Sequence, residues 1–279
     1  MDLISPNFSD LLKPNIEIKT FPDGDSYVRV ENLSACEGRE VKLYHRLYPD
    51  QNTAIFNALQ ILDTLKRADA QPTLVVPYLP YSRQDKTFKE GEALSAEILC
   101  SLFAKAGVKK LVTLDCHFLK KEGEFEYGGL KIKNISANKL LVEHAKSKLE
   151  GEDIEVISPD QGANYLVSSF GGKSMKKLRG EYEEGKEAYR KIEGVEMDFD
   201  VEGKNVLILD DMISTGGTMI RAVGNVRNGK AKKVFCAATH GFFLKGSLQK
   251  LSDITDGVFT TNSIANPVAE LDVLPLLKE

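Results

Sequence analysis

The residues with the clearest chemical meaning lie in the segment VLILDDMISTGGT, residues 206–218. Two carboxylates, Asp210 and Asp211, follow four apolar residues that predict a buried strand, and a loop rich in hydroxyls and glycine then leads into a predicted helix. The N-terminus of a helix presents unpaired backbone N–H groups and the positive end of the helix dipole, which together bind a phosphate. Glycines let the backbone curl around the anion, and hydroxyls donate to it. The candidate phosphate ligands are Ser214, Thr215, Gly216, Gly217 and Thr218.

The two carboxylates of this segment require a different target, because Asp210 and Asp211 would repel a phosphate. Ribose hydroxyls or a magnesium ion, one sugar length away, are suitable targets, so the pattern predicts a site for ribose 5-phosphate. The alternative is an ordinary buried strand followed by a polar turn. Paired carboxylates at a strand end are costly to bury without a partner, which favours the binding site.

Polar residues follow two further predicted strands. LVTLDCHF, residues 111–118, places Asp115 and His117 two positions apart, so we expect them on one side of the chain with Cys116 facing away. Such an Asp-x-His pair can hold a divalent cation, although a lone histidine satisfied by the protein is the alternative. SPDQGA, residues 158–163, brings a carboxylate to a strand end just before a helix, which suits a magnesium-bridged pyrophosphate.

Two segments carry weaker signals when taken alone. PYLPYSRQDK, residues 77–86, places Arg83 and Gln84 beyond a strand, where a solvated charged turn is the alternative. TFPDGDSYVRV, residues 20–30, predicts a hairpin with an aromatic ring and two acids around a glycine turn. The segment FGGKS resembles the end of a Walker A loop, but Val167 stands where that motif requires glycine, so we interpret it as a helix-ending loop.

Strands and helices alternate along the chain. The apolar spacing predicts helices at residues 52–68, 92–106, 138–149 and 219–228, and strands at 73–77, 111–114, 154–157, 206–209 and 234–238. This alternation favours an α/β fold with parallel sheets flanked by helices, in which chemistry gathers at the carboxyl ends of the strands. Both halves repeat the order strand, polar loop, helix, so we expect two domains, residues 1–134 and 135–279.

The composition is that of a soluble enzyme. The chain has 279 residues, 42% of them hydrophobic, and a net charge of −4, which gives no global bias towards nucleic acid. No apolar run approaches the ~18–20 residues of a membrane span, and residues 1–20 lack the apolar core of a secretory signal. The four cysteines lie far apart, as expected of free thiols in a reducing cytoplasm. We therefore expect a cytoplasmic protein with no nucleic-acid or membrane partner.

Taken in order, the motifs resemble those of the ribose-phosphate diphosphokinases, also called phosphoribosyl pyrophosphate synthetases. DDMISTGGT alone would also fit a phosphoribosyltransferase, whereas the ordered set is specific to the diphosphokinases. The motifs are FPDGD (21–25), PYLPYSRQDK (77–86), DCH (115–117), SPDQGA (158–163), the Lys-x-Arg of MKKLRGE (175–181), DDMISTGGT (210–218), THG (239–241) and TNSI (261–264).

The resemblance implies two phosphoribosyltransferase-like domains, the first on the ATP side and the second carrying the ribose 5-phosphate site. It also implies transfer of the diphosphoryl group of ATP to O1 of ribose 5-phosphate, with Mg²⁺ as cofactor, in a homo-oligomer of two or more copies. The implied ATP ligands are Phe21, Asp23, Gly24, Asp25, Arg83, Gln84, Asp85 and His117. The implied metal positions are His117 and Asp160, the catalytic pair is Lys177 and Arg179, and the sugar-phosphate site comprises Arg179, Asp210, Asp211 and residues 214–218.

The chain departs from the family pattern after RQDK, where it reads TFKEGEALS instead of the Arg-Ala-Pro-Ile type of sequence of phosphate-activated members. Lys89 is accompanied there by Glu90 and Glu92, whose charge opposes anion binding. We therefore expect an enzyme that needs no added phosphate. The charged segment 180–194 predicts a solvated hairpin or lid arm. A phosphoribosyltransferase and a non-catalytic, synthetase-like regulatory subunit are the alternative functions.

Overall fold

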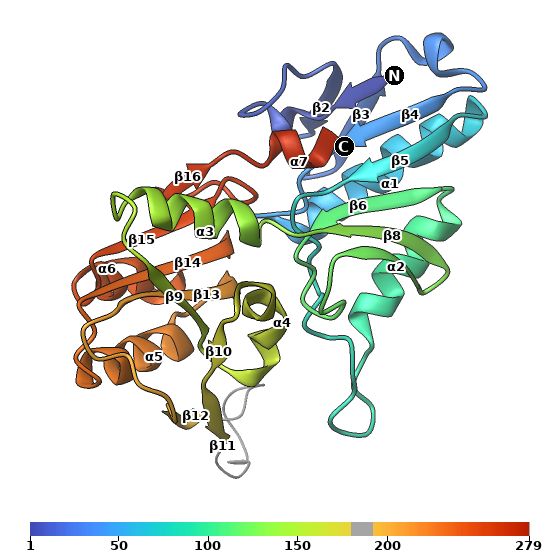
Figure 1. Ribbon diagram of the computed structural model, residues 1–279. Helices are drawn as coiled ribbons and strands as arrows, with labels where there is room; N and C mark the ends of the chain where they lie inside the picture. The colour runs from blue at the N-terminus through green and yellow to red at the C-terminus, as the bar shows by residue number, and fades with distance from the viewer. Residues whose placement is uncertain (180–191, 279) are drawn as a thin grey trace. The chain divides into compact units, whose positions relative to one another are not determined.

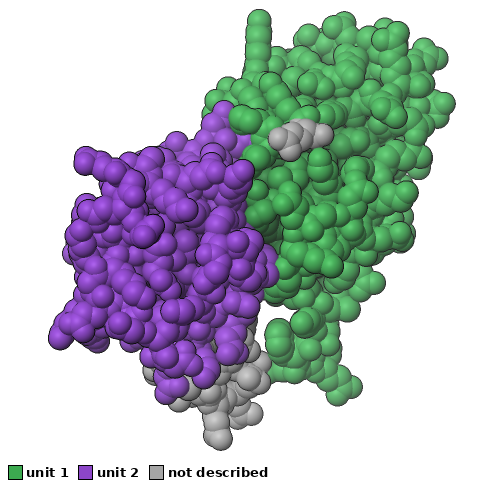
Figure 2. Space-filling view, in the orientation of Figure 1, with its two compact units in different colours: residues 1–136, 274–279 green, residues 137–273 purple. Residues whose placement is uncertain are grey.

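The computed structural model of the chain describes residues 1–179 and 192–278, with the backbone alone for residues 177–179 and 192–195 (Figure 1). The chain divides into two compact units, shown in different colours in Figure 2. The first unit comprises residues 1–136 together with 274–279, and the second comprises residues 137–273. Each unit is built around its own six-stranded sheet.

The first unit has a sheet of order β1-β4-β5-β6-β8-β7, in which β7 alone is antiparallel to its neighbour. Its strands are β1 (Asp2–Ile4), β4 (Glu40–Tyr44), β5 (Gln71–Val75), β6 (Lys110–Leu114), β7 (Gly123–Tyr127) and β8 (Leu130–Ile135). Its helices are α1 (Gln51–Arg67), α2 (Ser95–Lys105) and α7 (Leu274–Lys278). A separate hairpin, β2 (Ile16–Thr20) with β3 (Ser26–Val30), packs against α1.

The second unit has a wholly parallel sheet of order β10-β9-β13-β14-β15-β16. Its strands are β9 (Ile154–Ser158), β10 (Lys173–Ser174), β13 (Asn205–Ile213), β14 (Lys233–Gly241), β15 (Gly257–Thr261) and β16 (Ala269–Leu271). Its helices are α3 (Asn138–Ser147), α4 (Asn164–Val167), α5 (Gly217–Asn228) and α6 (Ser247–Ser252). A two-stranded ribbon, β11 (Lys176–Arg179) with β12 (Ile192–Glu196), stands apart from the sheet.

Burial of apolar side chains explains why these segments form these elements. In α1 the residues at helical spacing, such as Ala58, Ile61 and Leu65, are fully buried in the core of the first unit. In β13 the apolar run from Val206 to Leu209 is buried on both faces, as expected of a central strand in a parallel sheet. The core therefore fixes the strands whose ends carry the polar motifs.

The expected alternation of strands and helices is confirmed, with shifts at element ends. The strand expected at 206–209 continues to Ile213, so Asp210 and Asp211 lie within β13 and not after it. The helix expected from residue 92 begins at Ser95. All four cysteines are free and buried, and Cys116 belongs to the core of the first unit.

The ends of the two units differ from the expected boundary. The first unit continues to residue 136, and residues 274–279, which the sequence assigned to the second domain, group with the first. There the carbonyl of Lys278 accepts a 3.1 Å hydrogen bond from Nζ of Lys42. Within the described part of the chain, no helix has the length and apolarity needed to cross a membrane.

Candidate active site

The phosphate loop, residues 214–218, connects β13 to α5 in the second unit. Since β13 pairs with β9 and β14, the loop leaves the carboxyl edge from the middle of the sheet. Gly216 is the N-cap of α5 and has a left-handed backbone with φ of 74°. A Cβ added at Gly216 would lie 2.7 Å from Cβ of Ser247, so both the conformation and the packing require glycine.

The first turn of α5 provides hydrogen-bond donors. The N–H groups of Gly217, Thr218 and Met219 have no acceptor within the helix, since the first intrahelical bond runs from the N–H of Ile220 to the carbonyl of Gly216, at 2.8 Å. Among the described residues, the structure gives these three groups no other acceptor. Together with the partly exposed hydroxyl side chains of Ser214 and Thr218, this turn is suited to a phosphate dianion.

Three carboxylates gather at the ends of β9 and β13. Asp210 is partly buried and Asp211 is 4% exposed. Burial, together with the carboxylates of Asp211 and Asp160, raises the pKa of Asp210 well above its ordinary value. Such a concentration of negative charge favours a cation or a hydroxyl-rich ligand at this edge of the sheet.

Asp160 follows β9 and caps the turn that leads into α4. Its Oδ1 accepts a 2.7 Å hydrogen bond from the N–H of Gly162, and its backbone carbonyl accepts one from Oγ of Ser158 at 3.0 Å. The FGGKS segment ends a short helical turn at Gly171, which is left-handed, and continues into β10. This confirms that FGGKS is a helix-ending loop.

The carboxylates of the second unit fit a magnesium ion whose coordination shell is completed by substrate. Among the residues that the structure describes, no group of three or more His, Cys, Asp or Glu side chains is arranged to hold a metal ion. Mg²⁺ commonly binds through one or two carboxylates, with substrate phosphates and water completing its shell. The crowded carboxylates of Asp160, Asp210 and Asp211 match that mode by charge and by hard oxygen donors.

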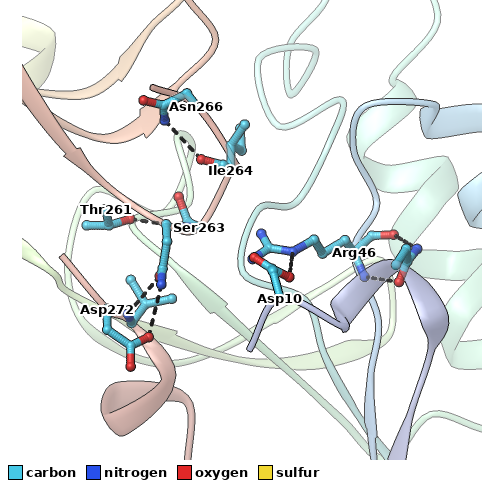
Figure 3. Close-up of polar contacts among 10 residues, drawn as sticks. Asp10, Arg46, Thr261, Ser263, Ile264, Asn266 and Asp272 are labelled. Atoms are coloured by element: carbon cyan, nitrogen blue, oxygen red, sulfur yellow. Dashed lines mark hydrogen bonds and ion pairs between the residues drawn. The ribbon is translucent and has the colours of Figure 1, made fainter. Parts of the chain in front are cut away.

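The THG and TNSI motifs form a buried polar network at the ends of β14 and β15. Within TNSI, the N–H of Ser263 donates to Oγ1 of Thr261 at 3.1 Å (Figure 3). The carbonyl of Thr239 accepts hydrogen bonds from the hydroxyls of Thr261 and Ser263, both at 2.7 Å. Nδ1 of His240 lies 2.9 Å from Oγ of Ser263. Because every one of these side chains is nearly fully buried, the network ties the two strand ends into one rigid edge.

In the first unit, the FPDGD segment forms the turn of the β2–β3 hairpin, which confirms the expected hairpin. The N–H of Phe21 donates to the carbonyl of Asp25 at 2.8 Å, and Gly24 has a φ of 98°. Oδ1 of Asp23 accepts a 3.2 Å bond from the N–H of Asp25. The Phe21 side chain is 52% exposed and meets the ring of Tyr27 edge-on, so one face of it is accessible for stacking.

The RQD residues lie before α2. Arg83 and Gln84 are exposed and Asp85 is partly exposed. Gln84 is attached to the start of the helix, since its Oε1 accepts from Oγ of Ser95 and its carbonyl accepts from the N–H of Ala96 at 3.2 Å. This attachment holds the segment at the N-terminal end of α2.

The expectation that Asp115 and His117 share one side of the chain relied on strand alternation, and that reasoning was wrong. β6 ends at Leu114, and Asp115 has a left-handed φ of 34°. Asp115 is 2% exposed, whereas His117 is partly exposed. The N–H of Cys116 donates to Oδ1 of Asn134 at 2.8 Å, which fixes the turn on which His117 lies.

The catalytic pair expected in the Lys-x-Arg motif lies on the ribbon. Lys177 pairs with Val195 and Arg179 with Ile192, and a register shift occurs between Leu178 and Arg179. The side chains of Lys177 and Arg179, and the charged segment from residue 180 to 191, lie outside the described residues. The base of the ribbon is held by a 2.9 Å ion pair between Lys176 and Asp198.

Comparison with known proteins decides the family. The model for the N-terminal domain of ribose phosphate pyrophosphokinase matches residues 10–107, and that for the phosphoribosyl transferase domain matches residues 161–273. The ribose-phosphate pyrophosphokinase of Pyrococcus furiosus is 35% identical over 94% of this chain and 90% of its own length. The Sulfurisphaera tokodaii relative of the same name is 36% identical, with the same coverage. The chain belongs to the ribose-phosphate pyrophosphokinase family.

The fold and the enzyme class follow from this membership. The solved structure of phosphoribosylpyrophosphate synthetase from Mycobacterium smegmatis covers 99% of this chain and 95% of its own, with a TM-score of 0.78 and 26% identity. The match of the N-terminal domain model separates the chain from a phosphoribosyltransferase, which was one of the alternatives. The resemblance read from the motifs, the α/β fold and the diphosphotransferase class are thereby confirmed.

The sequence did not reveal two polar arrangements of the first unit. Oε2 of Glu92 accepts hydrogen bonds from the N–H groups of Phe88, at 2.6 Å, and Lys89, at 3.1 Å, and these hold the pKa of Glu92 below its usual range. Arg46, two residues after the end of β4, is buried and forms an ion pair with Asp10 at 2.8 Å (Figure 3). Two signals in the sequence were available. Glu92 lies three to four residues after its N–H donors, and His45 and Arg46 follow an apolar strand.

Proposed function

We propose that this chain transfers the β,γ-diphosphoryl group of ATP to O1 of D-ribose 5-phosphate, giving 5-phospho-α-D-ribose 1-diphosphate and AMP. In this reaction O1 attacks the β-phosphorus, and the bond from that phosphorus to the oxygen bridging to the α-phosphate breaks. The observation that carries the proposal is the phosphate loop with its unsatisfied N–H groups beside the carboxylates of Asp210 and Asp211, in a chain of this family.

We assign the sugar to the second unit. The loop from Ser214 to Thr218 binds the 5-phosphate through backbone N–H groups and hydroxyls. Asp210 and Asp211 accept hydrogen bonds from ribose hydroxyls or face the metal. The left-handed Gly216 supports this assignment, because it curves the backbone into the first turn of α5.

We assign the nucleotide mainly to residues of the first unit. The exposed ring of Phe21 stacks on adenine, while Asp23 and Asp25 accept hydrogen bonds from the base. Arg83 donates to phosphate oxygens as a planar fork. The remaining proposed nucleotide ligands are Gly24, Gln84, Asp85 and His117.

His117 and Asp160 are the proposed Mg²⁺ ligands. When bound, the ion neutralises charge on the diphosphoryl group. Lys177 and Arg179 supply positive charge to the transferred group and the α-phosphate, and Arg179 also contacts ribose 5-phosphate. Catalysis of this kind relies on positioning and electrostatics, and it requires no general base from the protein.

We further propose that the enzyme works in the cytoplasm as a homo-oligomer. The four free, buried cysteines support a reducing compartment. The FPDGD turn, whose Phe21 ring is half exposed, supports an oligomer in which this turn serves the nucleotide site of a neighbouring subunit. The mass of the purified protein by light scattering tests the oligomer.

An assay of AMP release tests the reaction. Isotope-labelled ATP with magnesium and ribose 5-phosphate should give AMP and the 1-diphosphate in equal amounts, and omission of the sugar should abolish both. A phosphoribosyltransferase would release no AMP, and a regulatory subunit would have no activity alone. Either result contradicts the proposal.

A further inference from the structure

The segment 242–247 donates hydrogen bonds to the backbone where β13 enters the phosphate loop. The carbonyl of Ile213 accepts hydrogen bonds from the N–H groups of Phe242, at 2.9 Å, and Phe243, at 3.2 Å. The carbonyl of Ser214 accepts one from the N–H of Leu244 at 2.9 Å and one from Oγ of Ser247 at 3.2 Å. Four donors from six consecutive residues thus fix two successive carbonyls, the last of β13 and the first of the loop.

The segment 242–247 has an unusual backbone conformation. Phe243 and Lys245 have φ values of 50° and 56°, a left-handed region that residues with a Cβ rarely adopt, and Gly246 follows at 69°. Surrounding structure must over-determine a backbone that carries such strain, and strain of this kind gathers at functional sites. The ring of Phe243 packs over Gly241, where an added Cβ would lie 2.6 Å from it.

Ser247 is the side chain through which this segment reaches the loop. It is fully buried, its Cβ occupies the space beside Gly216, and its hydroxyl bonds to the carbonyl of Ser214. In a trans peptide the C=O and the N–H point in opposite directions. Because the carbonyl of Ser214 points towards the hydroxyl of Ser247, the N–H of Thr215 points away from Ser247.

We propose that Ser247 is a positioning residue for ribose 5-phosphate, an inference that rests on the proposed function. Its hydroxyl orients the Ser214–Thr215 peptide so that the N–H of Thr215 faces the 5-phosphate. Its Cβ blocks movement of the Gly216 backbone towards α6. A loop with two consecutive glycines has many conformations in the free chain, so an anchor from outside the loop lowers the entropy lost when the phosphate binds.

Two substitutions at this position separate the hydroxyl from the Cβ. Ser247→Ala removes the hydroxyl and keeps the packing, and we expect the KM for ribose 5-phosphate to rise about three- to tenfold. Ser247→Gly removes both contacts and should raise this KM further. In both variants, kcat at saturating sugar and the KM for ATP should stay within about twofold of the wild type, because the bound loop has the same geometry. Calorimetric titration with ribose 5-phosphate alone should show the same ratio of affinities.

Thr255→Val is the matched control. The Thr255 hydroxyl also donates to a backbone carbonyl, that of Leu251 at 2.8 Å, but at the far end of α6. This variant should leave both KM values unchanged. An unchanged sugar KM in Ser247→Ala, an equal rise in the KM for ATP, or the same effect in Thr255→Val would overturn the positioning role. A wild-type protein that releases no AMP would instead overturn the proposed function and the inference with it, so the two failures are distinguishable.

Discussion

The sugar-phosphate residues of the second unit and the nucleotide residues of the first unit are prepared to different degrees. The phosphate loop is fixed before any ligand arrives, since the carbonyls of Ile213 and Ser214 each accept two hydrogen bonds and Gly216 is packed against Ser247. The proposed ATP ligands Phe21 and Arg83 are instead exposed on loops. A rigid phosphate site lowers the entropy lost on binding, whereas exposed side chains depend on the ligand or on a neighbouring copy to order them.

The difference has a chemical logic. A phosphate dianion is small and symmetrical, so a few N–H groups of fixed direction recognise it fully. A nucleotide is long, and its stacking and charge contacts come from side chains that lie far apart in sequence. Substitutions in the fixed loop should therefore affect the binding of ribose 5-phosphate, and substitutions of the exposed side chains should affect the binding of ATP.

The largest effect is expected at Lys177, which we propose to stabilise the diphosphoryl group during its transfer. Lys177→Ala should lower kcat by about 10²–10⁴-fold with little change in ATP affinity, because one cation that stabilises the transition state is lost. Steady-state kinetics and nucleotide titration check this. Lys176→Ala, one position away and paired with Asp198, is the matched control and should keep most of the activity. Near-normal turnover in Lys177→Ala would remove this residue from catalysis.

The next effect concerns stability of the first unit at low pH. His45 is fully buried, and burial lowers its pKa from 6.5 to about 4. The unfolded chain therefore binds a proton between these values that the folded chain does not, so stability falls as the pH drops from 6.5 towards 4. The expected loss is about 3 kcal/mol. Denaturant unfolding of wild type and His45→Gln across this range measures it, and equal pH slopes would contradict the assignment.

The sugar site should respond to changes in the loop selectively. Thr218→Ala removes a hydroxyl that donates to the phosphate, and Asp211→Asn removes a carboxylate charge near the sugar. Each should raise the KM for ribose 5-phosphate about 10–100-fold and that for ATP far less. Equal effects on both substrates would show that the loop is not dedicated to the sugar phosphate.

A smaller effect is expected in the exposed hairpin. Phe21→Ala should raise the KM for ATP about five- to thirtyfold through lost stacking on adenine, without changing thermal stability, because the ring is half exposed. Phe56→Ala is the matched control, since this phenylalanine is 55% exposed on α1 and has no proposed ligand. A loss of ATP affinity in both variants would mean that the effect is not specific to the hairpin.

The smallest effect is expected from added inorganic phosphate. The N–H groups of Phe88 and Lys89 already donate to the Glu92 carboxylate, so the chain occupies donors that an anion would need. Activity without phosphate should be within about twofold of that with it, and ADP should inhibit in competition with ATP. Strong activation by phosphate, or ADP inhibition that saturating ATP does not relieve, would show an allosteric site.

Much of the fold was predictable because its signals are local. The apolar run before Asp210 predicted a buried strand, and the glycine-rich segment after it predicted a loop at a helix start; both are confirmed. The ends of elements were less predictable. Strand pairing with β14 extends β13 through both aspartates, and this hydrogen bonding depends on residues more than twenty positions away.

The sequence by itself determined the chemistry available to this protein. The hydroxyls, glycines and carboxylates of residues 210–218 define a phosphate and sugar site, because backbone N–H groups at a helix start and their charge preference are properties of a short segment. The ordered set of motifs along both units indicated the family, which the comparisons confirmed.

Only the tertiary structure decided how that chemistry is held. Ser247 reaches the carbonyl of Ser214 from 33 positions along the chain, and the carboxylate of Asp160 lies close enough to Asp210 to raise its pKa. Neither relation leaves a pattern in the sequence, because a serine at the start of a helix and an aspartate after a strand are compatible with many neighbours. The order of strands in the sheet selects those neighbours, and with them the direction in which each N–H and each charge acts.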